Sequence, residues 1–318
     1  MRVLLTGVAG FIGSHLAERL LARGHAIVGL DNFDPFYDPA IKQRNLAAVG
    51  GQPRFELVRG DIRDEGLVKA LLDRAPRVDL VCHLAALAGV RPSLAEPGRY
   101  ASVNVGGTLS LLEACRRHGV ARLVFASSSS VYGARSEVPF RESDPAVRPA
   151  SPYAATKRAG ELLCATYADL YGLETTCLRF FTVYGPRQRP EMAIHKFTRL
   201  LAAGTPVPLF GDGSSARDYT YVDDIIDGTV AAVERPRPGF TIYNLGGSQA
   251  TSLARLVELI AAALGTTAAV ERLAMQPGDV PITYADVALA GRDLGYTPKV
   301  PIDEGITRFV EWFRAQPT

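Results

Sequence analysis

The first residues of chemical interest are a tyrosine and a lysine, four positions apart in the segment SPYAATK. The apolar periodicity from Ser151 to Gly172 predicts one helix, with Ser151 as its cap and Pro152 in its first turn. Tyr153 and Lys157 then lie on one face of that helix. A neighbouring ammonium favours the ionised form of a tyrosine, whose ordinary pKa is about 10. The pair therefore predicts a tyrosine that acts as a base toward a hydroxyl group.

A glycine-rich turn near the start of the chain predicts a dinucleotide site. The segment TGVAGFIGSH carries Gly7, Gly10 and Gly13 after a strand-like run and opens a helix-like segment, which is the context that a dinucleotide fingerprint requires. Such glycines allow close approach to a pyrophosphate, whose charge a helix N-terminus favours. A Tyr-x-x-x-Lys pair alone is usually an exposed helix face, and a glycine turn alone is weak evidence. Together they favour a catalytic tyrosine.

Asp31 indicates which dinucleotide the site binds. It ends the second predicted strand, where a carboxylate accepts hydrogen bonds from both adenosine ribose hydroxyls and repels a 2′-phosphate. The next residue is Asn32 rather than an arginine. We therefore predict NAD, not NADP, as the cofactor.

Two further polar segments have two interpretations each. Ser127 to Ser130 end an apolar strand-like run, and the carboxyl ends of strands are where open α/β sheets bind ligands. We expect one of these hydroxyls to orient a substrate hydroxyl toward Tyr153, the other interpretation being a polar strand end. Arg187 and Arg189 follow another apolar run in FFTVYGPRQRP. They indicate either a solvated loop or an anion site.

The composition excludes several functional classes. The 318 residues are 47% hydrophobic, with 35 basic and 33 acidic residues and a net charge of +2, and no basic block suggests a nucleic-acid partner. The cysteines at 82, 115, 164 and 177 lack metal-ligand spacing, so we predict no metal site and reduced thiols. Met1 leads directly into a strand-like run, and no apolar stretch is long enough to span a bilayer. We expect a cytoplasmic protein without a membrane partner.

The order of elements predicts an α/β fold. Strand-like and helix-like segments alternate through the first half, which is typical of a Rossmann-type doubly wound parallel sheet. We expect a NAD-binding domain over residues 1–178, to which a strand around 221–247 returns. Residues 179–220 and 248–318 are expected to form a smaller, interleaved nucleotide-sugar-binding domain.

A set of motifs resembles the extended short-chain dehydrogenase/reductase family along nearly the whole chain. They are TGVAGFIG, DN at Asp31, GDIRD, HLAA, NVGGT, SSSSVYG, YAATK, RDYTYVDD and PGDV. Within the family, RFFTVYGPRQRPEMAIHKF is most similar to bacterial UDP-glucuronic acid 4-epimerases. The resemblance implies NAD-dependent 4-epimerisation of UDP-glucuronic acid to UDP-galacturonic acid through a transient 4-keto intermediate.

The resemblance also implies the site residues. Ser128, Tyr153 and Lys157 form the catalytic set. The implied cofactor-binding residues are Gly7, Gly10, Phe11, Ile12, Gly13, Asp31, Asn32, Asp61, Ile62, Leu84, Ala85, Ala86, Asn104, Ser127, Tyr153 and Lys157. The implied substrate-binding residues are Ser128, Ser129, Thr182, Arg189, Phe210, Arg217 and Asp279.

Four of the implied substrate residues are assigned to particular groups of the substrate. Arg217 is expected at the UDP diphosphate and Phe210 near the uracil. Arg189 is assigned to the sugar carboxylate, which a guanidinium binds through two parallel hydrogen bonds. Thr182 adds a hydroxyl contact to that group, and Arg187 faces either the diphosphate or solvent.

Three positions depart from patterns in the family. Relatives that dehydrate or decarboxylate carry glutamate where this chain has Ser130. Galactose-type epimerases carry asparagine at Thr182 and arginine at Gln276. Ser130 disfavours a UDP-glucuronate decarboxylase. Thr182 argues against a plain UDP-galactose epimerase, and Gln276 removes one expected diphosphate contact.

Other interpretations remain open at this point. They are a 4-epimerase of a neutral UDP-sugar (UDP-glucose, UDP-galactose or their N-acetyl forms), the decarboxylase, and a non-catalytic NAD-bound sensor. Relatives commonly dimerise through two helices, which here are expected around Leu109–Arg117 and Glu161–Tyr171. We expect a homodimer, although these apolar faces fit a core equally well.

Overall fold

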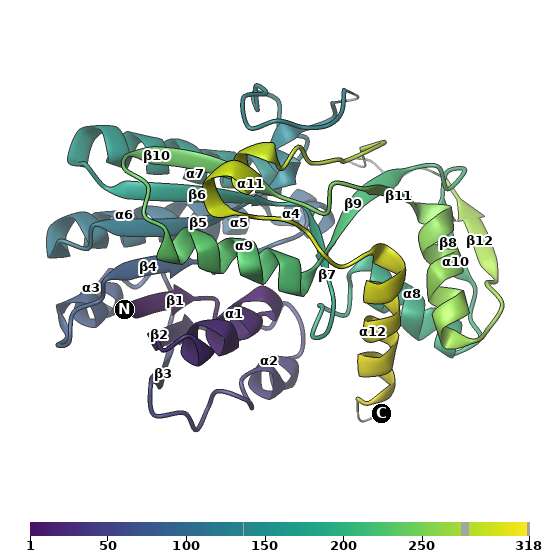
Figure 1. Cartoon of the computed structure of the whole chain (residues 1–318), viewed down its shortest axis with the longest axis horizontal. Coiled ribbons are helices and arrows are strands. Elements are labelled where there is room, and N and C mark those ends of the chain that lie inside the picture. Colours follow the sequence, from purple (N-terminus) through teal and green to yellow (C-terminus); the bar gives the residue numbers. More distant parts are fainter. Residues whose placement is uncertain (136, 275–279, 317–318) are drawn as a thin grey trace.

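A computed structural model of the chain describes residues 1–135, 137–274 and 280–316. Its centre is a parallel sheet of seven strands in the order β10-β6-β5-β4-β1-β2-β3 (Figure 1). These strands are β1 (Arg2–Thr6), β2 (Ala26–Asp31), β3 (Phe55–Arg59), β4 (Leu80–His83), β5 (Arg122–Ser128), β6 (Glu174–Phe180) and β10 (Phe240–Leu245). The strand order reverses between β1 and β4, which opens a crevice at their carboxyl ends.

Helices cover both faces of this sheet. On one face α1 (Phe11–Ala22) packs beside α9 (Val222–Glu234), and α11 (Ala288–Leu294) packs on α9 and β10. On the other face lie α3 (Glu65–Asp73), α6 (Gly107–His118) and α7 (Pro152–Tyr171) (Figure 1). Because both faces are covered, the central strands are apolar throughout; in β1, Val3, Leu4 and Leu5 are fully buried. The predicted doubly wound α/β fold is confirmed.

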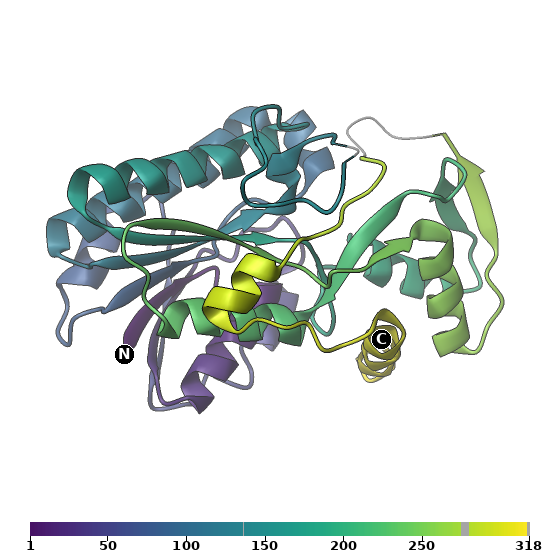
Figure 2. The same ribbon diagram turned by 45° about the horizontal axis from the view of Figure 1, so that its top comes forward.

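A smaller part stands beside the carboxyl ends of the strands (Figure 2). It holds a sheet of β7 (Thr182–Tyr184), β9 (Ala216–Tyr221) and β11 (Ala250–Ser252), and a pair of β8 (Val207–Phe210) and β12 (Val270–Leu273). Its helices are α8 (Ala193–Ala202), α10 (Leu253–Leu264) and α12 (Ile302–Arg314). Between its segments, α9 and β10 run back to the main sheet, so the two parts interleave.

Short helices fill the connections after three of the sheet strands. They are α2 (Pro39–Asn45) after β2, then α4 (Val90–Ala95), α5 (Pro97–Tyr100) and the π-helical η1 (Ala101–Gly106) after β4, and the 3-10 helix η2 (Ser129–Tyr132) after β5. All of them lie on the carboxyl side of the strands that precede them. The connections on this side of the sheet therefore supply side chains to the crevice.

The helix predicted to carry the Tyr-x-x-x-Lys pair is α7. The Ser151 hydroxyl accepts a hydrogen bond from the amide of Ala154, and Gly172 ends the helix with a left-handed φ of 68°. The Ser151 cap predicted from the sequence is thus confirmed. It places Tyr153 in the first turn of α7, where a hydrogen bond joins it to Ser128 at the end of β5.

Among the residues that the structure describes, no helix combines the length and the apolar character needed to cross a bilayer.

Candidate active site

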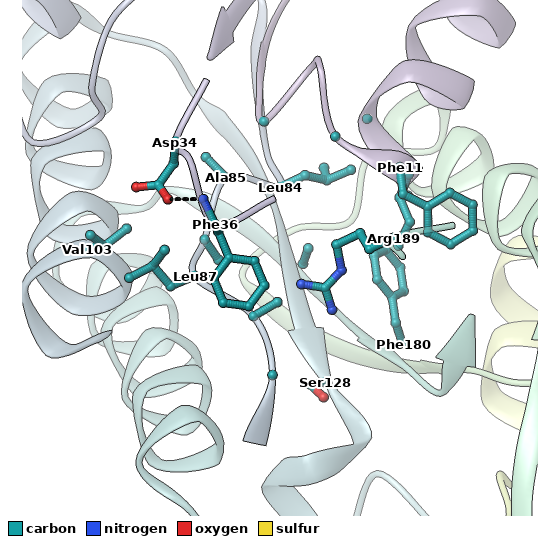
Figure 3. Close-up of a pocket in the computed structure, with 18 of the residues that line it drawn as sticks. Phe11, Asp34, Phe36, Leu84, Ala85, Leu87, Val103, Ser128, Phe180 and Arg189 are labelled. Carbon is teal, nitrogen blue, oxygen red and sulfur yellow. Dashed lines mark hydrogen bonds between the residues drawn. The ribbon is translucent and has the colours of Figure 1, made fainter. Parts of the chain in front are cut away.

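A cleft of about 400 Å³ lies at the carboxyl ends of the parallel strands. Figure 3 shows part of its wall, with Phe11 and Phe180 on one side and Asp34, Leu87 and Val103 on the other. The structure brings most of the sequence-predicted residues to this cleft, namely Gly7, Gly10, Phe11, Ile12, Gly13, Asp31, Asn32, Asp61, Ile62, Leu84, Ala85, Ala86, Ser127, Ser128, Ser129, Tyr153, Lys157, Thr182 and Arg189. They come from segments spread over more than half of the chain.

The glycine turn packs too closely for any side chain. A Cβ on Gly7, whose φ is 72°, would lie 2.8 Å from the amide nitrogen of Ala85. A Cβ on Gly13 would lie 2.1 Å from the carbonyl oxygen of Gly7. The N-terminus of α1 begins at Gly10 with no side-chain cap, so its first amides face the cleft. This cradle fits the pyrophosphate of a dinucleotide.

Asp31 is fixed at the end of β2 by two backbone amides. Its carboxylate accepts hydrogen bonds from Ala9 N at 3.0 Å and from Phe33 N at 2.8 Å. Beside it, the Asn32 amide donates to Asp61 at 3.1 Å. Hydrogen bonds from Arg63 lower the pKa of Asp61 to about 2. The ribose and adenine end of the cleft therefore carries acidic groups in fixed positions, which suits NAD.

Asn104 and Ser127 use their side chains to hold neighbouring segments of the protein. The Asn104 side chain accepts a hydrogen bond from Leu87 N at 2.8 Å and donates one to Leu87 O at 2.9 Å. Asn104 is absent from the described lining residues and instead holds the loop after β4 in place. Ser127 lines the cleft, but its hydroxyl donates to Glu161 at 2.6 Å. Glu161 is fully buried and also accepts two hydrogen bonds from Arg179.

Tyr153 lies at the centre of the cleft with Ser128 next to it. Burial raises the pKa of Tyr153, while a hydrogen bond with Ser128 and the charge of Arg189 oppose that rise. The Ser128 hydroxyl also donates to the Ser130 hydroxyl at 3.1 Å. The protein alone thus keeps Tyr153 protonated at neutral pH, and its ionisation depends on further positive charge.

Lys157 lines the same cleft, one helical turn after Tyr153 on α7. Its ammonium donates to the carbonyl of Ala126 at 2.7 Å and stands 5.0 Å from the centre of the Phe125 ring. Burial lowers the pKa of Lys157 from 10.5 to about 8, an effect that nearby Glu161 opposes. The side chain remains charged at neutral pH.

The Arg189 side chain projects into the cleft. Figure 3 shows its guanidinium between Phe36 and Phe180, facing the space over Ser128. It stands 5.7 Å from the Phe36 ring and pairs with Glu191 at 3.2 Å. Its side chain is 19% exposed, so most of its surface is already out of water. A guanidinium held this way binds an anion with less loss of entropy than a free surface arginine.

The Arg187 side chain points away from the cleft and toward α1. Its guanidinium forms an ion pair with Glu18 of α1 at 2.7 Å and donates to Ser14 at 3.3 Å. It therefore faces neither the cleft lining nor open solvent, the two places considered from the sequence.

A second cavity of about 210 Å³ adjoins the cleft. Arg217 lines it, and Ser129, Ser130 and Thr182 line both cavities. Phe210 is absent from the described lining residues of both; its ring lies 5.0 Å from the Arg91 guanidinium. Asp279 and Gln276 lie outside the described residues.

Several residues of the cleft were not predicted from the sequence. They are Asp34, Phe36, Tyr37, Lys42 and Met192, of which the first four follow β2. Arg99 holds this loop by an ion pair with Asp34 at 2.7 Å. The available signal was position alone, since the segment DNFDPFYDP leaves the carboxyl end of a strand beside the nucleotide turn.

The described residues contain no cluster of three or more His, Cys, Asp or Glu side chains that could hold a metal ion. The charged groups of the cleft are thus the carboxylates near Asp31 and the cations of Lys42, Lys157 and Arg189. These groups suit proton and hydride chemistry on a bound organic anion.

Comparisons with known proteins agree with this arrangement. Residues 3–246 match the model of the NAD dependent epimerase/dehydratase family. The UDP-glucuronate 4-epimerase of Thermodesulfobacterium geofontis is 42% identical over 310 residues, which cover 97% of this chain and 95% of that protein.

Two solved structures are similar over nearly the whole chain. UDP-glucuronic acid 4-epimerase from Bacillus cereus, in complex with UDP-glucuronic acid and NAD, has a TM-score of 0.92 and 37% identity, covering 99% of both chains. UDP-glucose 4-epimerase from Thermotoga maritima, with UDP-glucose, has a TM-score of 0.91 and 34% identity over 99% of both chains. The fold alone therefore does not separate an acidic from a neutral sugar substrate.

Proposed function

Because this chain belongs to the NAD dependent epimerase/dehydratase family, we propose that it interconverts UDP-glucuronic acid and UDP-galacturonic acid by inverting carbon 4. The observation that carries the proposal is the position of the Arg189 side chain in the cleft. It brings a largely buried guanidinium to the sugar end of a cleft whose other end fits NAD. A neutral sugar offers no charged partner to that group.

NAD supplies the reversible hydride acceptor for carbon 4. Gly7, Gly10 and Gly13 hold its pyrophosphate and Asp31 its adenosine ribose. Tyr153 removes the proton of the carbon-4 hydroxyl, with Ser128 orienting that hydroxyl and Lys157 favouring the phenolate. The resulting 4-keto sugar turns within the cleft, so that the hydride would return to the opposite face of carbon 4. Tyr153 returns the proton to the carbon-4 oxygen.

Arg189 has a second task in this reaction. A 4-keto derivative of glucuronic acid is a β-keto acid, which loses CO₂ readily when its carboxylate bond aligns with the ketone. A guanidinium that grips both carboxylate oxygens sets a fixed orientation that disfavours this alignment. Ser130 adds no carboxylate beside carbon 5, which disfavours the decarboxylase alternative.

Each of the two parts of the chain is proposed to bind a different molecule. We propose that residues 1–178 and the segment around 221–247 bind NAD, and that residues 179–220 and 248–318 bind the nucleotide sugar. Arg217 in the second cavity is proposed for the diphosphate, while Phe210 requires a movement to reach a uracil. The assignment of Asp279 remains a prediction.

The protein is further proposed to be a cytoplasmic homodimer. Leu109 on α6 and Leu162, Leu170 and Tyr171 on α7 are between 40% and 66% exposed, and both helices lie on the same face of the sheet. An apolar surface of this kind suits contact with a second copy of the chain. The cytoplasmic location is supported by the four cysteines of the chain, which are free and buried, as in a reducing compartment. Light scattering on the purified protein measures the mass that tests the dimer.

The reaction itself is tested by product analysis. The purified protein is incubated with UDP-glucuronate, and products are separated by anion exchange. We expect UDP-galacturonate as the main product. UDP-xylose as the main product would favour the decarboxylase, and no turnover of UDP-glucuronate would contradict the proposed function.

A further inference from the structure

The segment 185–190, which carries Arg189, is fastened to the cofactor-binding helix α1. Arg187 forms its ion pair with Glu18 at 2.7 Å, and its guanidinium also donates to Ser14. One position away, the His15 ring nitrogen Nε2 donates to the carbonyl of Pro186 at 3.0 Å. Three contacts within little more than one helical turn thus join this segment to α1.

The other side of the segment is fastened to α8. Gln188 is buried, and its side chain donates to Val183 O at 3.1 Å and accepts from His195 N at 3.2 Å. The His195 ring donates to Gln188 O at 2.7 Å. Arg189 is therefore the residue of this segment that projects into the cleft, while its two predecessors are bound on either side.

The backbone at Arg187 shows that its placement is enforced. Its φ is 66°, in the left-handed region that a non-glycine residue seldom adopts. Such a conformation persists where surrounding contacts determine it. The contacts available for this are those with Ser14, Glu18 and, through Pro186, His15.

We propose that His15, Glu18 and Arg187, here called the α1 latch, are positioning residues that aim Arg189 at the substrate carboxylate. The proposal rests on the function proposed above and adds a group of residues that touches no substrate. It also links the two ends of the cleft, because α1 begins at the glycine turn and Phe11 of its first turn packs edge-on against His15 at 5.9 Å. Carboxylate recognition then depends on the helix that binds the NAD pyrophosphate.

Two substitutions open the latch without touching the cleft lining. Arg187→Gly removes the cation and suits the left-handed backbone, and Glu18→Gln removes the charge of its partner from the opposite side. The matched control is Arg23→Ala, which breaks the ion pair between the residue that caps the end of α1 and Glu234 at 2.6 Å, away from segment 185–190. All variants are studied as full-length protein with bound NAD.

Three quantities are measured for each variant. The KM for UDP-glucuronate is expected to rise about tenfold in both latch variants, a fold-change typical of a lost coupling between contacting residues. The inhibition constant of UDP, which has no carboxylate, is expected to stay within about twofold of wild type. The fraction of turnovers that lose CO₂ is expected to increase severalfold. Arg23→Ala is expected to leave all three unchanged.

A double variant completes the test. If the ion pair acts as one unit, Glu18→Gln combined with Arg187→Gly raises KM little more than either change alone. Latch variants that match Arg23→Ala in KM and in CO₂ loss would overturn the proposal. A UDP inhibition constant that rises as much as KM would also overturn it, because the substitutions would then have weakened binding of the whole nucleotide. A wild-type protein that does not turn over UDP-glucuronate would instead refute the proposed function, so the two failures are distinguishable.

Discussion

The end of the cleft that receives NAD is built from backbone at strand ends, whereas the sugar end is built from side chains on irregular segments. At the NAD end, Gly7 and Gly13 bring main chain into contact with main chain, and Asp31 is fixed by two amides. At the sugar end, Arg189 depends on a segment fastened to α1 and α8. In the proposed function, the rigid end binds the NAD cofactor and the end that carries Arg189 selects the sugar.

Tyr153 stands where the two ends meet, so removing its hydroxyl separates binding from chemistry. Tyr153→Phe is expected to lower kcat by about 10²- to 10⁴-fold, the range attributed to a general base. NAD content and affinity for UDP-glucuronate should remain near wild type, since Tyr153 is one of many residues lining the cleft. Steady-state kinetics and calorimetry measure the two quantities. A variant that keeps a tenth of its kcat would show that another group takes the proton.

Arg189→Ala removes the cation proposed to bind the sugar carboxylate. We expect KM for UDP-glucuronate to rise about 10²-fold, as when a buried charged partner is removed, with some substrate diverted to decarboxylated UDP-pentose. Arg189→Lys keeps the charge but not the two-pronged geometry, so it should recover affinity more than product fidelity. Chromatography of the products follows both effects. Unchanged kinetics in Arg189→Ala would remove the carboxylate assignment.

Lys157 tests whether a buried charged group in the cleft lowers the free energy of unfolding of the protein. Its pKa falls from 10.5 to about 8 on folding, so the unfolded chain binds the proton more tightly. Stability should therefore rise between about pH 8 and 10.5, while below pH 8 the full penalty is present. Lys157→Met should be inactive yet more stable at pH 7, by about 2 kcal/mol.

Denaturant titrations of both proteins at pH 7 and pH 10 measure this difference. It should shrink at pH 10, where the wild-type lysine is largely neutral in the folded state. A constant difference across that range would mean that the stability change has another cause.

Asp31→Asn is expected to give the smallest change. The amide oxygen can still accept a hydrogen bond, while the charge that favours the ribose hydroxyls and repels a 2′-phosphate is lost. NAD affinity should fall about tenfold, the effect of one charged hydrogen bond, and the preference over NADP should narrow. Titration calorimetry on cofactor-stripped protein with each dinucleotide measures both. An unaltered preference would place the discrimination elsewhere.

The same contrast explains what the sequence could predict. The sheet, the α7 cap at Ser151 and the glycine turn follow from local periodicity and backbone requirements, which short segments express by themselves. The outward turn of Arg187 toward Glu18 depends on two segments far apart in the chain. Asn104 was expected in the cofactor channel, yet its amide fits the backbone of Leu87 behind the wall. Tyr37 and Lys42 lie on a loop with no periodic pattern to indicate which side chains turn inward.

The most direct test of the account follows the sugar protons by NMR in D₂O. The protein, as purified and with no added cofactor, is mixed with UDP-glucuronate in one tube and UDP-glucose in another. The account predicts UDP-galacturonate from the acid only, with ordinary hydrogen retained at carbon 4, because hydride leaves and returns within one closed site. UDP-galactose from UDP-glucose, or deuterium at carbon 4 of the product, would contradict it.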